Sequence, residues 1–195
     1  MHVQLLQRQH PALAASFHKL RQDIGRLTAL VDSLLALARL DPLARSQLAS
    51  GPVAVQPLFE GLEAEYAPDA ARRGIALALR SRIDTVQGDP QMLGIVLRNL
   101  VGNALRYCPA GSRVEVEALR HAGRERITVR DDGPGVDSDT MPRLTERFFR
   151  VLGQEEGGSG LGLSIVQRIA DLHGITLAFG PGLDGRGLGV TLDWA

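Results

Sequence analysis

The feature that most constrains the fold is a pair of segments, "RVEVEALR" at 113–120 and "ERITVRDD" at 125–132, in which apolar and polar residues alternate strictly. The connection between them, "HAGR", is short and carries a glycine. Strict alternation has the two-residue period of a β-strand, and two such segments joined by a short glycine-bearing turn indicate a β-hairpin. The chain is therefore expected to contain an antiparallel pair of strands near its middle.

Shorter strands and helices surround this hairpin. Hydrophobic periodicity predicts helices at about 57–72, 90–107 and 161–174, and strands at 53–56, 75–80, 175–180 and 189–194. A polar loop at about 137–158 precedes the last helix, whose end at Gly174 suits a helix C-cap. This order predicts an α/β (α+β) two-layer sandwich, in which one mixed β-sheet is covered by a layer of helices.

The N-terminal part of the chain has a different pattern. Residues 12–40 contain no proline and carry an apolar stripe spaced by three and four residues: Phe17, Leu20, Ile24, Leu27, Val31 and Leu34. A long, narrow stripe is typical of a helix that packs in a hairpin or bundle, and Pro11 suits the turn before it. Small, polar and proline residues follow, which predicts a domain boundary near 41–51.

The composition argues against several classes of function. Lys+Arg 22 balances Asp+Glu 22, so no broad electrostatic field favours nucleic acid or an acidic membrane as a partner. The single cysteine, Cys108, excludes an internal disulfide and disfavours a thiolate metal cluster. No apolar run reaches the roughly 18 residues of a membrane span, and the first residues lack a signal-peptide pattern. We therefore expect a soluble chain whose function comes from a local site.

Two asparagines, Asn99 and Asn103, lie four residues apart in the predicted helix 90–107 and so project from one face. Polar residues on a helix surface are the simpler explanation, but most of their neighbours in this helix are apolar. A buried amide without a partner costs a few kcal/mol. A cation shared with phosphate oxygens would supply that partner, because Mg²⁺ is usually held by one or two protein oxygens plus phosphate.

Two glycine-bearing motifs follow the asparagines. "DDGPG" at 131–135 ends a predicted strand, where Asp131 is either a turn residue or an acceptor for an exocyclic amine, with glycines that let the backbone approach a planar base. "GGSGLGLSIV" at 157–166 opens a predicted helix, whose first amides and dipole favour anions. It lacks the lysine of a P-loop and no predicted strand immediately precedes it, so neither the Walker nor the Rossmann interpretation fits.

Taken together, these motifs resemble the ATP-binding domain of bacterial two-component sensor histidine kinases, over roughly residues 50–195. The matching segments are "LRNLVGNALRY" as the N box, "DDGPG" as the G1 box, "RFFR" as the F box, "GSGLGL" as the G2 box and "GRGLGVTL" as the closing segment. The resemblance implies a Bergerat-type ATP-binding fold at 46–195. "LTALVDSLLALARLD" resembles the second helix of the family's dimerisation and phosphotransfer hairpin, which implies a partial helical hairpin at 1–45.

The resemblance also implies ATP and Mg²⁺ as ligands. Asn103 would ligate Mg²⁺, Asn99 would help to hold the phosphates, Arg106 and Tyr107 would border the nucleotide, and Asp131 would read adenine. Phe148 and Arg150 would belong to a lid, with Arg150 as a γ-phosphate contact. The other implied nucleotide-binding positions are Gly133, Gly135, Gly158, Ser159, Gly160, Leu161, Gly162, Leu163 and Thr191.

The amide at Asn99 distinguishes among relatives that share this ATP pocket. Gyrase, the mismatch-repair ATPases and the heat-shock chaperone resemble one another in placing a glutamate there. A carboxylate can act as a general base on water, whereas an amide cannot. The sequence therefore favours phosphoryl transfer to another nucleophile over hydrolysis. The alternatives are an ATPase of the same superfamily, which steady phosphate release would reveal, and an anti-sigma-type serine kinase, which a missing histidine hairpin upstream would favour.

None of the histidines has the features expected of the phosphoryl acceptor. They are His2, His10, His18, His121 and His173. His18 lies in "SFHKLRQDI", which resembles the acceptor segment, but Lys19 replaces the acidic residue that would orient the imidazole, and Asp23 replaces the expected proline. His173, in "DLHG" at a helix end, is expected to be structural. The acceptor is therefore expected upstream of Met1.

The implied partners are a response-regulator receiver domain and a second copy of the chain, with neither nucleic acid nor a membrane contacting this fragment. The fragment is expected to be cytoplasmic, and the full-length protein to lie in the bacterial inner membrane. The sequence departs from the family pattern at Thr145, in place of the first F-box aromatic, and at Ile175, where a second glycine is usual. The lid "VLGQEEGG" is also short.

Overall fold

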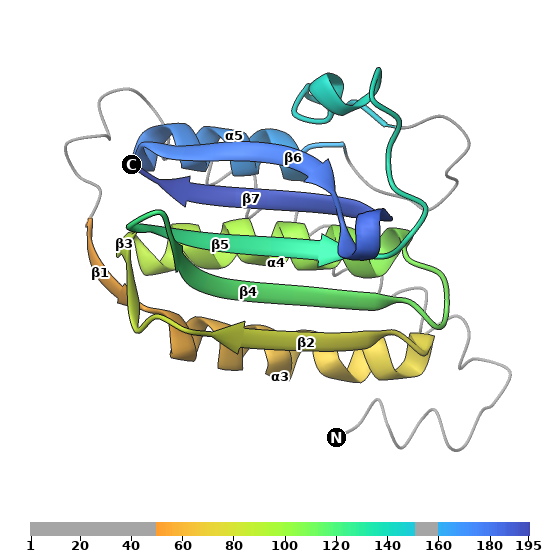
Figure 1. Ribbon diagram of the computed structural model, residues 1–195, viewed down its shortest axis with the longest axis horizontal. Coiled ribbons are helices and arrows are strands. Elements are labelled where there is room, and N and C mark those ends of the chain that lie inside the picture. Colours follow the sequence, from red (N-terminus) through yellow and green to blue (C-terminus); the bar gives the residue numbers. More distant parts are fainter. Residues whose placement is uncertain (1–49, 151–159) are drawn as a thin grey trace, which may run out of the picture. The chain divides into compact units, whose positions relative to one another are not determined.

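The computed structural model describes residues 50–150 and 160–195 (Figure 1). Its elements are β1 (Gly51–Ala54), α3 (Val55–Arg73), β2 (Ala76–Ser81), β3 (Thr85–Gly88), α4 (Pro90–Tyr107), β4 (Arg113–His121), β5 (Arg124–Asp131), the short 3₁₀ turn η2 (Met141–Arg143), α5 (Gly162–His173), β6 (Ile175–Pro181), the 3₁₀ turn η3 (Leu183–Gly185) and β7 (Leu188–Trp194). The predicted helical hairpin at 1–45 and the segment 151–159 lie outside the described residues.

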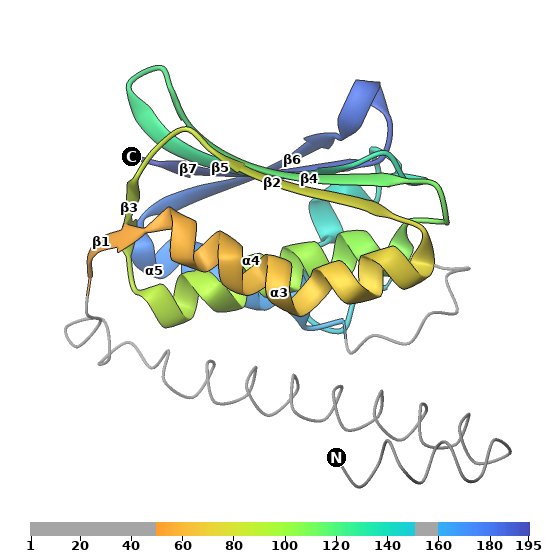
Figure 2. The same ribbon diagram turned by 90° about the horizontal axis from the view of Figure 1, so that it is seen from below.

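Five strands form the main sheet, in the order β2-β4-β5-β7-β6. β2 runs parallel to β4 and the other neighbouring pairs are antiparallel, so the sheet is mixed. The helices α3, α4 and α5 lie together on one side of it (Figure 2). This arrangement confirms the predicted two-layer α/β sandwich. β1 and β3 form a separate two-stranded antiparallel sheet.

The helix α4 begins and ends where its sequence predicts. The Asp89 carboxylate accepts hydrogen bonds from the backbone N–H groups of Gln91 and Met92, each at 2.9 Å, and Pro90 occupies the first turn, where its missing N–H is harmless. Nine residues of the helix are buried: Met92, Leu93, Gly94, Val96, Leu97, Leu100, Val101, Ala104 and Leu105. Packing of this apolar side against the rest of the core fixes which face of α4 carries the asparagines.

The predicted strand 53–56 is displaced in the structure, because the chain turns into α3 at Val55. The Val55 N–H donates to the Asp84 carbonyl at 2.9 Å, and Pro57 fits the first turn, whose N–H groups need no helical acceptor. An apolar–small–apolar sequence therefore looked like a strand although its last residues begin a helix.

The β4–β5 hairpin places the carboxylate of Asp131 on the helix side of the sheet. Val116 pairs with Val129 and both are buried beneath the helices, and Asp131, two residues further along β5, points to the same side. The opposite face carries charged pairs, such as Arg126 with Asp193 at 2.6 Å. Asp131 thus lies at the end of a strand and at the edge of the core.

The C-terminal end of α5 is tied to the N-terminal end of α4. Gly174 caps α5 with φ 67°, a left-handed conformation that suits glycine. The His173 ring accepts through Nε2 from the Asp89 N–H at 3.2 Å, so Nδ1 carries the hydrogen and donates to the Ile169 carbonyl at 2.8 Å. His173 is therefore a structural residue that fixes the two helices together.

Candidate nucleotide-binding site

The two asparagines of α4 face the first turn of α5. Asn99 Nδ2 donates to the Ile95 carbonyl at 2.8 Å, which turns its Oδ1 outward. A Cβ at Gly162, the first residue of α5, would lie 2.8 Å from Asn99 Oδ1 and 3.8 Å from Asn103 Nδ2. Only glycine fits this position unless the amide moves. The predicted N box and G2 box therefore meet through Gly162.

The first turn of α5 is suited to anions. The first N–H groups of any helix lack an intrahelical acceptor, and no side chain of the N-cap residue Leu161 caps this one. The N–H groups of Gly162 and Leu163 lie in that turn, beside the amides of α4. The positive end of the dipole of α5 lies at this turn and favours phosphate. Gly158 and Ser159, the other predicted phosphate contacts in this motif, lie outside the described residues.

Asn103 supplies an oxygen donor next to this turn. Its side chain is half-buried and makes no hydrogen bond within residues 50–150 and 160–195. Over the same residues, no group of three or more His, Cys, Asp and Glu side chains could hold a metal ion. A hard cation here would thus depend on the amide oxygen and on oxygens of the ligand, which is the usual coordination of Mg²⁺ beside phosphate.

Asp131 is one of the few buried polar side chains, with 8% of its surface exposed. Its Oδ1 accepts hydrogen bonds from the N–H groups of Gly133, at 2.9 Å, and Leu188, at 3.2 Å. Burial raises the pKa of the Asp131 carboxyl above its ordinary value, while these backbone N–H groups act in the opposite direction. The carboxylate is therefore held in place by backbone donors and kept from bulk water.

The Cys108 thiol lies beside Asp131, and both side chains limit residue 133. A Cβ on Gly133 would lie 2.9 Å from Cys108 Sγ and 3.0 Å from Asp131 Oδ1. Burial, reinforced by the negative charge of Asp131, raises the pKa of Cys108 to about 12, so the thiol stays protonated. Sequence reasoning found Gly133 but missed Cys108, whose only signal was its position just after the N box.

A collar of backbone from the β6–β7 connection closes around Asp131. A side chain on Gly182 or Gly187 would overlap the Asp131 carbonyl, and one on Gly135 would meet the Gly187 carbonyl at 2.9 Å. Gly135 and Gly187 also have φ of 72° and 69°, which favours glycine. The sequence predicts Gly135 at the site but assigns no role to Gly182, Gly187 or the Leu188 N–H. Their signals are the glycine cluster at 180–189 and, for Gly187 and Leu188, the closing segment "GRGLGVTL".

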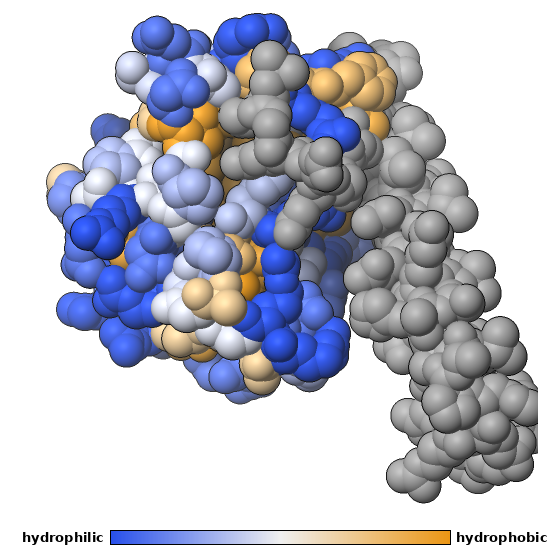
Figure 3. Space-filling model, turned by 90° about the vertical axis from the view of Figure 1, so that its right-hand side faces the viewer, coloured by the Kyte–Doolittle hydropathy of each residue, from blue (hydrophilic) through white to orange (hydrophobic). Residues whose placement is uncertain are grey.

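The predicted F box and G2 box are joined through their backbones. The Phe148 N–H donates to the Gly160 carbonyl at 2.9 Å, and a Cβ on Gly160 would lie 2.7 Å from Phe148 Cα. Phe148 has φ 64°, and 71% of its surface is exposed. Arg150, also exposed, is the last described residue before 151–159. Figure 3 shows the side of the molecule that lies at the right in Figure 1, where hydrophilic residues dominate the visible coloured surface.

Three further predicted positions lie on α4 and β7. Arg106 and Tyr107 form the last turn of α4 and are half-buried. Thr191 pairs with Thr128 of β5 on the sheet face opposite the helices, since its neighbours Val190 and Leu192 are buried on the helix side. The structure therefore does not bring Thr191 together with Asp131. Its place in the closing motif suggested proximity, but the alternation of strand side chains directs it away.

The amides of α4, the glycine-bearing start of α5 and the collared carboxylate of β5 lie within the part of the chain that matches a known family. Residues 88–194 match the family model described as histidine kinase-, DNA gyrase B- and HSP90-like ATPase, and the chain belongs to this family. Sensor protein QseC of Salmonella typhimurium is 40% identical over 90% of this chain and 38% of that protein. Sensor protein kinase PmrB of Pseudomonas aeruginosa is 38% identical over 92% of this chain and 38% of that protein.

Solved structures give the same result. Full-length ShkA in complex with AMPPNP has a TM-score of 0.73 at 31% identity, covering 92% of this chain and 38% of that one. The cytoplasmic segment of histidine kinase QseC has a TM-score of 0.60 at 33% identity, covering 88% and 94%. The chain spans well under half the length of the curated relatives it matches. Because these relatives are sensor kinases, the ATPase and serine-kinase alternatives are not favoured.

None of the helices in the described part of the chain combines the length and the apolar character that crossing a bilayer requires.

Proposed function

We propose that this chain is the ATP-binding catalytic part of a sensor histidine kinase, which binds ATP with Mg²⁺ and directs the γ-phosphoryl group to a histidine and then to a response-regulator aspartate. The observation that carries the proposal is the contact between Asn99 Oδ1 and Gly162, which puts an amide at the start of an anion-binding helix turn. The names of the sensor-kinase relatives support the same class.

The described residues offer a suitable contact for each part of an adenine nucleotide. Asp131, buried and oriented by two N–H groups, accepts a hydrogen bond from the exocyclic amine of adenine. The first N–H groups of α5 bind phosphate oxygens, and Asn99 donates to them through the second N–H of its Nδ2, because the first donates to the Ile95 carbonyl. Asn103 offers its amide oxygen to Mg²⁺. When bound, Mg²⁺ supplies charge neutralisation of the phosphates and orients them.

The amide at Asn99 determines what the site does with the bound nucleotide. A carboxylate in this place would abstract a proton from water, which an amide does not. Phosphoryl transfer needs little covalent chemistry from the protein, so binding the phosphates in line with an incoming imidazole supplies most of the catalysis. ATP is therefore kept from hydrolysis and delivered to the acceptor.

The proposal also covers the phosphoryl acceptor and the partners of the full-length kinase. The acceptor imidazole lies on the first helix of a phosphotransfer hairpin of the full-length kinase, and that kinase forms a homodimer through the hairpin. His18, which lies outside the described residues, is not the acceptor because Lys19 follows it. A receiver domain then takes the phosphoryl group, and the whole kinase is anchored in the inner membrane.

The test has two parts, binding and transfer. Calorimetry should show ATP-analogue binding that weakens when EDTA removes Mg²⁺, and Asp131→Ala should weaken it further. The chain should then phosphorylate a separately supplied histidine hairpin of a QseC-like kinase from labelled ATP, while releasing little free phosphate in its absence. Steady phosphate release without the hairpin, or a folded protein that ignores the nucleotide, would contradict the proposal.

A further inference from the structure

Two connections that are distant in the sequence meet at Asp131. One is residues 132–135, which follow β5, and the other is residues 182–187, which join β6 to β7 through η3. Leu188, the first residue of β7 and directly after the second connection, donates its N–H to Asp131 Oδ1 at 3.2 Å, so the orientation of the carboxylate depends on where that connection leads into β7. An interaction that holds the two connections in place relative to each other therefore also orients the Asp131 carboxylate, which is the proposed contact for the nucleobase.

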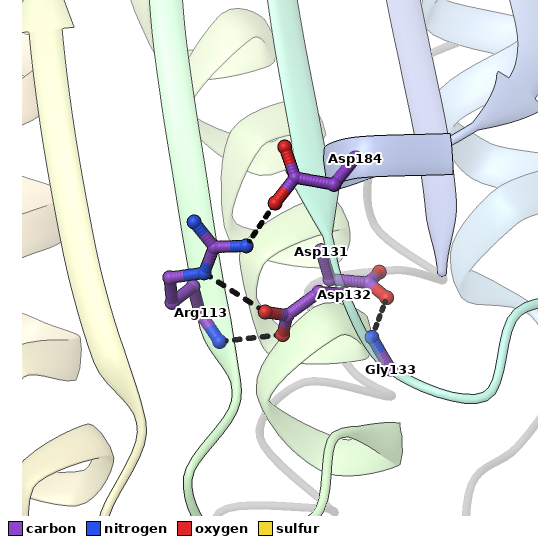
Figure 4. Close-up of polar contacts among 5 residues, drawn as sticks. All are labelled: Arg113, Asp131, Asp132, Gly133 and Asp184. Atoms are coloured by element: carbon purple, nitrogen blue, oxygen red, sulfur yellow. Dashed lines mark hydrogen bonds and ion pairs between the residues drawn. The ribbon is translucent and has the colours of Figure 1, made fainter. Parts of the chain in front are cut away.

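One arginine on β4 bridges both connections (Figure 4). Arg113 Nε donates to Asp132 Oδ2 at 2.9 Å and its backbone N–H donates to Asp132 Oδ1 at 2.6 Å, which ties the guanidinium to the first connection. Its NH2 group donates to Asp184 Oδ2 at 2.5 Å, in η3 of the second connection. The three-residue cluster Arg113, Asp132 and Asp184 is called the arginine bridge below.

The two carboxylates of the arginine bridge are held differently. The Arg113 backbone N–H and guanidinium lower the pKa of Asp132, whose side chain is only 17% exposed, so this half of the bridge stays ionised and anchored. The Asp184 side chain is 75% exposed and its backbone has φ 53°, an uncommon conformation for a residue other than glycine. Arg113 thus holds a fixed carboxylate on one side and an exposed turn on the other.

Global stability is not where such a bridge has its main effect. Ion pairs between exposed side chains contribute little to folding, and Arg113 is 47% exposed. Its geometric effect is local, because the turn that it holds is followed within three residues by Gly187 and the Leu188 N–H donor. Loss of the bridge therefore frees the second connection to shift against Asp131 while β4, β5 and the helices stay packed.

We infer that Arg113 is a positioning residue for nucleobase recognition: by bridging Asp132 and Asp184 it sets the orientation of the Asp131 carboxylate toward the exocyclic amine of adenine. The inference rests on the proposed function. It concerns only the base-reading end of the site, so phosphate binding by α4 and α5 should be independent of it.

The experiment compares two nucleotides, ATP and purine riboside triphosphate, which lacks the exocyclic amine, by calorimetry with the whole chain and Mg²⁺. The preference for ATP measures the amine contact. Arg113→Met should lower that preference roughly two- to fivefold, which is the range of a partly exposed ion pair, with unchanged affinity for purine riboside triphosphate. Asp184→Asn should act in the same direction, and Arg113→Lys should restore part of the preference, because lysine keeps the charge but not the fork.

The matched control is Arg120→Met, which removes the exposed Arg120–Glu125 pair at the other end of the β4–β5 hairpin. It should leave the preference for ATP unchanged. An unchanged preference in Arg113→Met, or equal weakening of both nucleotides, would overturn the inference and leave the proposed function standing. A wild-type protein that binds ATP no better than purine riboside triphosphate would instead refute the assignment of Asp131 itself.

Discussion

Replacing Gly162 by alanine should test the contact between α4 and α5 directly. The added Cβ would lie 2.8 Å from Asn99 Oδ1, whereas ordinary contact begins at 3.4 Å, so the amide must move by about 0.6 Å. That shift weakens the Asn99–Ile95 hydrogen bond, worth about 1 kcal/mol, and overpacking adds about 1–3 kcal/mol. The helix propensity of alanine returns at most about 1 kcal/mol. We expect the free energy of unfolding to fall by about 1–3 kcal/mol.

Nucleotide binding should respond more strongly than stability, because the displaced amide no longer faces the phosphates. A hydrogen bond to a charged group is worth about 1.5–3 kcal/mol, so the affinity for ATP should fall at least about tenfold. Urea denaturation and calorimetry measure the two effects separately. Gly61→Ala in α3 is the matched control, since no atom lies within 4 Å of the added Cβ. It should stabilise the protein by about 0.5–1 kcal/mol without altering ATP binding.

A Gly162→Ala protein as stable as Gly61→Ala, with wild-type affinity for ATP, would refute this reasoning. Such a result would mean that Asn99 does not face the first turn of α5 in solution.

Three other changes have predictable results. Asn103→Ala should weaken ATP binding about tenfold in millimolar Mg²⁺ and remove most of the difference that EDTA makes, as calorimetry can show. Asp131→Asn should raise the melting temperature of the nucleotide-free protein at pH 7, because the raised pKa of Asp131 means that its ionised form disfavours folding. This penalty disappears as the pH falls through the pKa of Asp131. The melting temperatures of the two proteins should therefore converge in acid. Gly174→Ala should lower the free energy of unfolding by about 1 kcal/mol in urea denaturation, because φ is 67° there; an unchanged midpoint would contradict the strain.

Local patterns explain why much of the fold was predictable. The capping carboxylate of Asp89, Pro90 and an unbroken apolar face define α4, and strict alternation defines the β4–β5 hairpin. The pairing of β1 with β3 was not predictable, because strands of four residues carry no signal for a partner more than 30 residues away. The same limitation applies to Val55, whose change from strand to helix depends on a hydrogen bond to Asp84.

The site divides in the same way. Asn99, Asn103 and Asp131 could be predicted as candidates because each is a polar residue in a buried pattern or at the end of a strand. The collar around Asp131 was not predicted: Gly187 and Leu188 lie in the closing segment "GRGLGVTL" but had no assigned role, and their approach to Asp131, like that of Gly182, depends on how the β6–β7 connection folds against the end of β5. Thr191 stays a nucleotide-binding prediction, and its position in a motif could not show which side of the sheet it faces, because that depends on its pairing with Thr128.

The fluorescence of the tryptophan at the end of β7 can report on whether the protein is folded. Trp194 is the only tryptophan in the chain, it is 5% exposed, and its Nε1 donates to the Gln87 carbonyl at 2.6 Å. It lies next to Asp193, which pairs with Arg126 at the other end of β5 from Asp131, roughly 15–20 Å away along the strand. Its fluorescence emission should therefore change when the native fold is lost and remain unchanged when nucleotide binds.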